Sequence, residues 1–166
     1  MKKLVIAVDC DDVLVRSTPF FVETYNQIYG TNVTLDTAHD NAAAWGVDNT
    51  TVAARLAELM ETEAYKNLSP SNEEVTILNA LSKDHELHVI TARRPHERDL
   101  TQLMLDTYVP GVFRSLELVG FTGSKGEIIK SIHADVLIDD NLRHLNDAVK
   151  HGLPKEGAIL FGDYAW

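Results

Sequence analysis

The chain has 166 residues, of which 45% are hydrophobic and 24% are charged, values typical of a soluble globular protein with one domain and room for a small insertion. Its formal net charge of -10 argues against binding to nucleic-acid polymers or membrane surfaces through a basic patch, and leaves small anionic substrates open. The single cysteine excludes an intrachain disulfide and favours a reducing compartment. We therefore expect a cytoplasmic protein, and composition says nothing of its oligomeric state.

A short apolar run opens the chain and ends in a cluster of carboxylates. Its length and its Val and Ile content, in the sequence LVIAV from Leu4, predict a buried parallel strand rather than a signal peptide. Asp9, Asp11 and Asp12 follow at its carboxyl end, where ligands bind in open α/β sheets. Acids this close repel one another unless a cation neutralises them, which indicates Mg²⁺. An Asp-rich turn without a metal is the alternative.

Helical patterns then interrupt the alternation of strands and helices between residues 17 and 70. The segment holds several residues that begin or end helices: Ser17 or Thr18, Gly30, and Asn49 or Thr50. We interpret residues 17–70 as a helical cap inserted after the first strand. Residues 1–16 and 71–166 would then form the core domain.

The alternation resumes after this insertion. Apolar runs predict strands at 86–94, 115–121, 134–141 and 157–162, and helical patterns separate them at Ser71 onward, Pro95 onward, 123–133 and 142–152. Strands that alternate with helices predict a parallel sheet with right-handed crossovers. The expected fold is a three-layer α/β structure with a parallel sheet of about five strands.

The first candidate site is the pair Asp9 and Asp11. Period-two alternation places their side chains on the same side of a strand end. One carboxylate can attack a phosphorus atom while the second carries a proton for the leaving group. The spacing therefore suits hydrolysis in two steps through a phosphoaspartate.

A second candidate site is the strand end VITARR. The hydroxyl of Thr91 and the backbone N–H groups of Ala92 and Arg93 could hold phosphate oxygens, with a favourable helix dipole behind Pro95. A plain turn at Thr91 is the alternative. Arg93 or Arg94 could contact substrate, and a solvated approach to the next helix is equally open for each.

Two further groups complete the candidate site. Lys125, at a predicted helix start, can neutralise a nucleophilic carboxylate and a transferring phosphoryl group, although a lone lysine there can also be solvated surface. Asp139 and Asp140 end an apolar strand. With Asp9 and the backbone carbonyl of Asp11 they could hold Mg²⁺ together with several waters.

Taken in order, VDCDDVL, VITAR, Lys125 and LIDD resemble the haloacid dehalogenase-like hydrolase superfamily. The resemblance implies a Rossmann-like core, Asp9 as nucleophile, Asp11 as general acid/base, and Thr91 and Lys125 as phosphate and charge anchors. It also implies Mg²⁺ as cofactor, with Asp140 favoured over Asp139 as the direct ligand. A small phosphorylated substrate is the expected partner.

Within the superfamily the DxDxVL form and the small helical insertion look most like the 5′(3′)-deoxyribonucleotidase group, which implies a (deoxy)nucleoside 5′-monophosphate as substrate. Asp12 stands where a glycine is frequent and adds negative charge beside the substrate. Trp45 is expected to line the site and to stack on a planar leaving group.

Other functions of the same residues stay open. A sugar-phosphate phosphatase or a phosphotransferase would use the same groups. Carbon–halogen hydrolysis needs neither Asp11 nor the pair Asp139 and Asp140, which argue against it. A non-enzymatic alternative is a catalytically silent binding module, and the presence of all four motifs argues against it.

Overall fold

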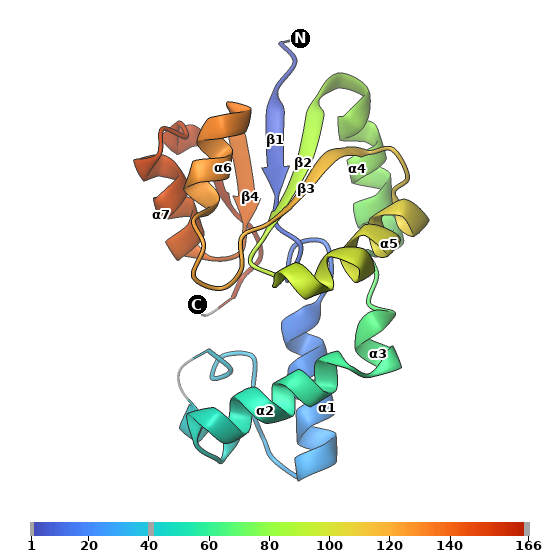
Figure 1. The fold of residues 1–166 in the computed structure, drawn as a ribbon, viewed down its shortest axis with the longest axis vertical. Coiled ribbons are helices and arrows are strands. Elements are labelled where there is room, and N and C mark those ends of the chain that lie inside the picture. Colours follow the sequence, from blue (N-terminus) through green and yellow to red (C-terminus); the bar gives the residue numbers. More distant parts are fainter. Residues whose placement is uncertain (1, 40–41, 165–166) are drawn as a thin grey trace. The chain divides into compact units, whose positions relative to one another are not determined.

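The computed structural model describes residues 2–39 and 42–164. A five-stranded sheet with the order β3-β2-β1-β4-β5 forms one of its two compact units, and every neighbouring pair of strands is parallel (Figure 1). The strands are β1 Val5–Val8, β2 Glu86–Thr91, β3 Phe113–Leu118, β4 Val136–Asp139 and β5 Ala158–Leu160. The predicted α/β fold with five parallel strands is confirmed.

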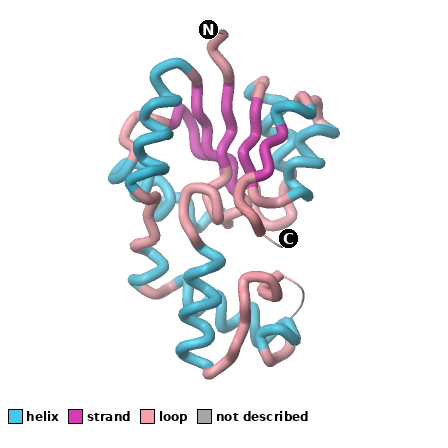
Figure 2. The backbone as a smooth tube through the Cα atoms, turned by 180° about the vertical axis from the view of Figure 1, so that it is seen from behind, coloured by secondary structure: helices cyan, strands magenta, loops and turns pink. Residues whose placement is uncertain are grey.

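Helices flank this sheet on both sides (Figure 2). In the described residues they are α4 Asn72–Asp84, α5 Arg98–Tyr108, α6 Lys125–Ile132 and α7 Leu142–Lys150, with 3₁₀ turns at η2 Pro95–Glu97 and η3 Lys155–Gly157. Helix α4 packs on β2 and α5 on β3, whereas α7 packs on β4 and β5 and alongside α6. Strand order reverses between β1 and β4, which in sheets of this kind opens a ligand-binding crevice at the carboxyl ends.

The central strands form because both of their faces are covered. Ala7 in β1 and Leu137 in β4 are fully buried, and they join a core cluster with Ile129 of α6 and Leu145 of α7. Burying a leucine side chain fully contributes about 1.5–3 kcal/mol. The cluster therefore fixes the two strands whose ends carry acids.

The second unit spans Arg16–Leu68 and has a core of its own. Its elements are α1 Ser17–Tyr29, η1 Ala42–Trp45, α2 Asn49–Met60 and α3 Glu63–Lys66. Helix α1 ends at Gly30 in the left-handed conformation, as predicted. Asp48 caps α2 by accepting a hydrogen bond from Thr51 N, whereas the sequence analysis expected the cap one or two residues later.

The sheet unit comprises the chain up to Val15 together with Ser69–Gly162. The C-terminal Asp163 and Tyr164 group with the second unit, whereas the sequence analysis assigned them to the core. Residues 165 and 166 lie outside the described residues. No helix in the described part of the chain combines the length and the apolar character needed to cross a bilayer.

Candidate active site

The predicted acids lie at the carboxyl edge of the parallel sheet, at and just beyond the ends of β1 and β4. Asp9 directly follows β1, and its backbone N–H donates to the carbonyl oxygen of Ile138 at 2.9 Å. This bond continues the pairing of β1 with β4 to the last residues of both strands. Asp9 and Asp139 are thereby brought together from distant parts of the sequence.

Lys125 lies between these two acids. Its Nζ is 2.7 Å from Asp9 Oδ2 and 2.7 Å from Asp139 Oδ2. All three residues are buried, and Lys125 and Asp139 are 0% exposed. Hydrogen bonds between ionised partners are short and strong, so the ammonium holds the two carboxylates in one place. The structure therefore brings together three of the residues predicted from the sequence.

Burial shapes the ionisation of this group. It raises the pKa of Asp9 to about 7, although Lys125 opposes the shift. Burial also raises the pKa of Asp139, again against the pull of Lys125. For Lys125 burial would lower the pKa, but attraction to Asp9 and Asp139 outweighs it, so that pKa lies above its ordinary value. The lysine therefore carries its charge at neutral pH, where Asp9 is near its titration midpoint.

Carboxylate oxygens at this edge are close enough to share a cation. One oxygen from each of Asp9, Asp139 and Asp140 lies within 4.8 Å of the others, and all three residues are buried. Three acids against the ammonium of Lys125 leave an excess of negative charge, and carboxylate oxygens are ligands that Mg²⁺ prefers. The residues therefore fit a magnesium ion.

Asp139 is held on both of its oxygens. Oδ2 accepts from Lys125 Nζ, and Oδ1 accepts from the backbone N–H of Asn141 at 2.9 Å. Both oxygens of Asp139 therefore already accept a hydrogen bond within the protein. The assignment of Asp140 as the direct ligand stays a prediction.

The side chain of Asp11 has a partner that the sequence did not indicate. Its carboxylate, 31% exposed, forms a two-pronged ion pair with Arg93, with Nε to Oδ2 and Nη2 to Oδ1 both at 2.9 Å. Arg93 is buried, so it is not the solvated arginine that the sequence left open. The Asp11 carboxylate is not a member of the acid cluster described above, and its backbone carbonyl stays the predicted metal contact.

Thr91 ends β2 and is fully buried. Its Oγ1 accepts a hydrogen bond from Arg93 N at 3.2 Å, which closes the turn after the strand. Thr91 therefore takes part in a turn, as the alternative prediction had it. Its hydroxyl can still donate a hydrogen bond, and the predicted contact with phosphate stays a prediction. Ala92 is half-buried in the same turn.

The turn after β1 explains why a glycine suits the position of Asp12. Asp12 is buried and has a φ of +57°, in the left-handed region that glycine adopts without steric cost. Its N–H donates to the carbonyl oxygen of Val15 at 2.7 Å, and Leu14 N donates to Cys10 O at 2.8 Å. The chain thus reverses tightly directly after the two predicted catalytic acids.

Asp147 is a positioning residue that no sequence motif indicated. Its Oδ2 accepts hydrogen bonds from Ser124 Oγ at 2.8 Å and from Gly126 N at 2.9 Å. Burial would raise the pKa of Asp147, but these bonds lower it. The carboxylate therefore ties α7 to the first turn of α6, where Lys125 begins the helix.

His144 also escaped the sequence analysis. It is buried on α7, and burial together with the charges of Lys125 and Arg143 lowers its pKa to about 4. Its Nε2 lies 3.2 Å from Arg143 Nη2. The imidazole is therefore neutral at pH 7.

The prediction for Trp45 is not supported by its surroundings. Trp45 is 6% exposed and belongs to the core cluster of the second unit. Its indole N–H donates to the carbonyl oxygen of Ala38 at 3.0 Å, and its ring packs against Tyr25 with centroids 4.8 Å apart. An indole buried in this way fills a core instead of offering a face to a nucleobase. We therefore withdraw the stacking role, which a weak helical pattern around Trp45 had made plausible.

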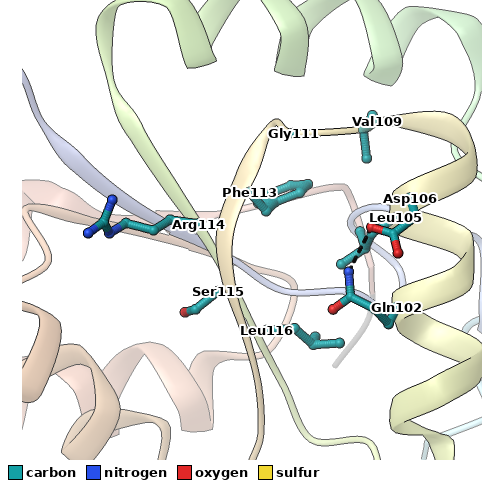
Figure 3. Close-up of a pocket in the computed structure, with 9 residues that line it drawn as sticks. All are labelled: Gln102, Leu105, Asp106, Val109, Gly111, Phe113, Arg114, Ser115 and Leu116. Atoms are coloured by element: carbon teal, nitrogen blue, oxygen red, sulfur yellow. Dashed lines mark hydrogen bonds between the residues drawn. The ribbon is translucent and has the colours of Figure 1, made fainter.

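The sheet unit also has hollows away from the acid cluster. One of about 280 Å³ lies beside the start of α6, and one of about 90 Å³ lies between α5 and β3 (Figure 3). In the smaller one Gln102 Nε2 donates to Asp106 Oδ1 at 2.9 Å. None of the predicted site residues lines either hollow.

No protein-family model matches this chain, and no curated protein matches it either. Solved structures do match. A haloacid dehalogenase-like hydrolase from Streptococcus pneumoniae superposes with a TM-score of 0.65 at 12% identity, over 91% of this chain and 82% of its own. The fold is that of the haloacid dehalogenase-like hydrolases.

Two further solved structures also superpose on this chain. The magnesium-bound hydrolase YfnB from Bacillus subtilis has a TM-score of 0.57 at 13% identity, over 92% of this chain and 87% of its own. A predicted phosphoglycolate phosphatase from Haemophilus somnus has a TM-score of 0.56 at 12% identity, over 99% and 96%. Identities this low show the fold alone, and none of the three is described as a deoxyribonucleotidase.

Proposed function

We propose that this protein is a Mg²⁺-dependent phosphomonoesterase that acts through a phosphoaspartate on Asp9. The observation that carries the proposal is the buried ion pair of Lys125 with Asp9 and Asp139 at the carboxyl ends of β1 and β4. Burying charges is costly unless they are paired, and here a lysine and two acids are fixed beside a third acid, Asp140. Such an arrangement suits chemistry on a highly charged group.

In the first step a carboxylate oxygen of Asp9 forms a bond to the phosphorus atom of the substrate. The bond from phosphorus to the ester oxygen breaks, and that oxygen takes a proton from Asp11 as the alcohol leaves. The products of this step are the free alcohol and an acyl phosphate on Asp9. Asp11 is left as a carboxylate.

In the second step Asp11 takes a proton from a water molecule. The water oxygen bonds to phosphorus, the bond from phosphorus to Asp9 breaks, and inorganic phosphate is released. Asp9 returns as a carboxylate and Asp11 returns to its protonated form. One mechanism thus uses the same two side chains in both halves of the reaction.

Lys125 keeps Asp9 in place and lowers the repulsion between the carboxylate and an incoming phosphate dianion. Thr91, at the end of β2 on the same edge of the sheet, would contact the phosphate through its hydroxyl. Asp9, Asp139 and Asp140 would hold the magnesium ion, which neutralises negative charge on the phosphoryl group when bound.

The substrate class in this proposal is a small phosphorylated metabolite. A (deoxy)nucleoside 5′-monophosphate is the finer candidate. It rests on the DxDxVL motif and the small helical insertion, without support from Trp45, which is buried. One structural neighbour is named a phosphoglycolate phosphatase, which supports small phosphate esters as the class to test.

Hydrolysis of p-nitrophenyl phosphate with and without Mg²⁺ tests the activity. We expect turnover that requires the metal and no turnover by Asp9→Asn. On an alkyl phosphate, whose leaving oxygen needs a proton, we expect a loss of about 10²–10⁴-fold in Asp11→Asn. Acid quenching during turnover should trap a phosphoenzyme in the wild type and none in Asp9→Asn. Undiminished hydrolysis by Asp9→Asn would remove Asp9 as the nucleophile. A panel of nucleoside monophosphates and sugar phosphates then tests the finer candidate.

A further inference from the structure

We propose that Arg93 is the positioning residue for Asp11, and that it acts through Asp11 instead of binding phosphate. This inference rests on the proposed function, because Arg93 would orient the side chain that serves as general acid/base in that reaction. The sequence alone predicts only that Arg93 or Arg94 could contact substrate.

The geometry of the pair supports an orienting role. Two different nitrogens of one guanidinium, Nε and Nη2, reach the two oxygens of Asp11, each at 2.9 Å. A planar fork matched to a planar carboxylate fixes the direction of the carboxylate as well as its position. A lysine or a single hydrogen bond would leave it free to turn.

The rest of the guanidinium is anchored to the fold. Nη1 of Arg93 donates to Thr101 Oγ1 at 3.0 Å, and Thr101 Oγ1 donates to the carbonyl oxygen of Glu97 at 2.8 Å. Thr101 is 0% exposed and Arg93 is 6% exposed. The orientation of Asp11 is therefore set by the first turns of α5 through a chain of buried contacts.

The backbone adds a second anchor at the same residue. Arg93 N donates to Thr91 Oγ1, and the carbonyl oxygen of Arg93 accepts from Gly120 N at 3.2 Å. Main chain and side chain are thus both fixed, between the ends of β2 and β3. An arginine held in this way has its fork directed at Asp11, and a substrate phosphate would have to displace a charged partner to bind it.

The proposal predicts a loss that depends on the leaving group. An alkyl phosphate needs a proton on its leaving oxygen, whereas p-nitrophenolate leaves without one. We expect Arg93→Met to lower kcat/KM for an alkyl phosphate at least about 100-fold and kcat/KM for p-nitrophenyl phosphate less than about 10-fold. Arg93→Lys should recover part of the loss, and Arg114→Met, on an exposed arginine of β3, should match the wild type.

A double-mutant cycle separates positioning from phosphate binding. If Arg93 acts through Asp11, the double variant Arg93→Met with Asp11→Asn should be no slower on the alkyl phosphate than Asp11→Asn alone. Equal losses on both substrates, or losses that multiply in the double variant, would overturn the proposal in favour of direct phosphate binding.

Folding and metal binding are measured on the same variants. Arg93→Met should keep the wild-type circular dichroism spectrum and the wild-type Mg²⁺ affinity by calorimetry, because the acid cluster does not include Arg93. Loss of either would make Arg93 a structural residue and overturn the proposal. Failure of the proposed function looks different: the wild type itself would hydrolyse neither ester, or Asp9→Asn would hydrolyse both.

Discussion

The binding of Mg²⁺ should depend on pH in a way that Asp9 sets. Burial raises the pKa of Asp9 to about 7, so a proton and the metal compete for the same carboxylate. At about pH 5.5, which is about 1.5 units below that pKa, the competition weakens apparent affinity about 30-fold, or about 2 kcal/mol. At about pH 8 the carboxylate is ionised, and proton competition hardly weakens the apparent Mg²⁺ affinity.

Isothermal titration calorimetry at the two pH values measures this directly. Repeating the titrations in buffers with different ionisation enthalpies counts protons, and we expect about one released per metal at the lower pH and almost none at the higher. Asp9→Asn should bind weakly at both values and lose most of the dependence, the remainder coming from Asp139, whose pKa burial also raises. Asp106→Asn, on an exposed carboxylate of α5, serves as the control and should keep it.

The raised pKa of Asp9 also determines how the stability of the metal-free protein changes with pH. The folded pKa of Asp9 lies above its ordinary 3.8, so the folded state binds the proton more tightly than the unfolded state does. This contribution to stability is present at low pH and is lost as the pH rises from about 4 to about 7. Equal Mg²⁺ affinity at the two pH values, or the same dependence in Asp9→Asn, would refute the reasoning.

Three other outcomes follow from the same geometry. Lys125→Met should lower the free energy of unfolding by about 3–5 kcal/mol, because two buried carboxylates lose their cation. Urea titrations at neutral pH measure this, and an unchanged unfolding midpoint would contradict the buried ion pair. Asp140→Ala should weaken calorimetric Mg²⁺ binding more than Asp139→Ala does, and equal losses would mean that the assignment within the pair is wrong. Asp12→Gly should be more stable than Asp12→Ala by about 1–2 kcal/mol, because both variants lose the carboxylate and only alanine is strained at a φ of +57°. Equal thermal unfolding midpoints of the two variants would show that the turn changes its backbone conformation to accommodate alanine.

Much of the sheet and of the acid cluster could be predicted because their signals are local. A buried parallel strand is a nearly continuous apolar run, so β1 and β4 are visible as patterns, and the acids that end them stand out. Lys125 was found because a helix start precedes one of those strands. Parallel strands end at a common edge, which is enough to bring these residues together.

What could not be predicted depends on contacts between side chains far apart in the sequence. Arg93 and Asp11 are 82 residues apart, and little in the local sequence distinguishes Arg93 from the neighbouring Arg94. One weak signal existed, since period-two alternation places Arg93 on the same side as Thr91. Trp45 lies in a short 3₁₀ segment with little helical periodicity, so its burial among the side chains of α1 and α2 left no mark in the sequence.

The position of β1 in the middle of the sheet has a consequence for how the protein is made. Strand β1 precedes both of its neighbours, β2 and β4, in the chain, and Val5 N donates to Asp135 Oδ2, 130 residues further along. Contacts this distant in sequence slow folding. Asp9 is synthesised before Lys125, its buried counterion, so on the nascent chain its carboxylate is not yet paired with that ammonium. The ion pair of Asp9 with Lys125 therefore forms only after Lys125 has been synthesised.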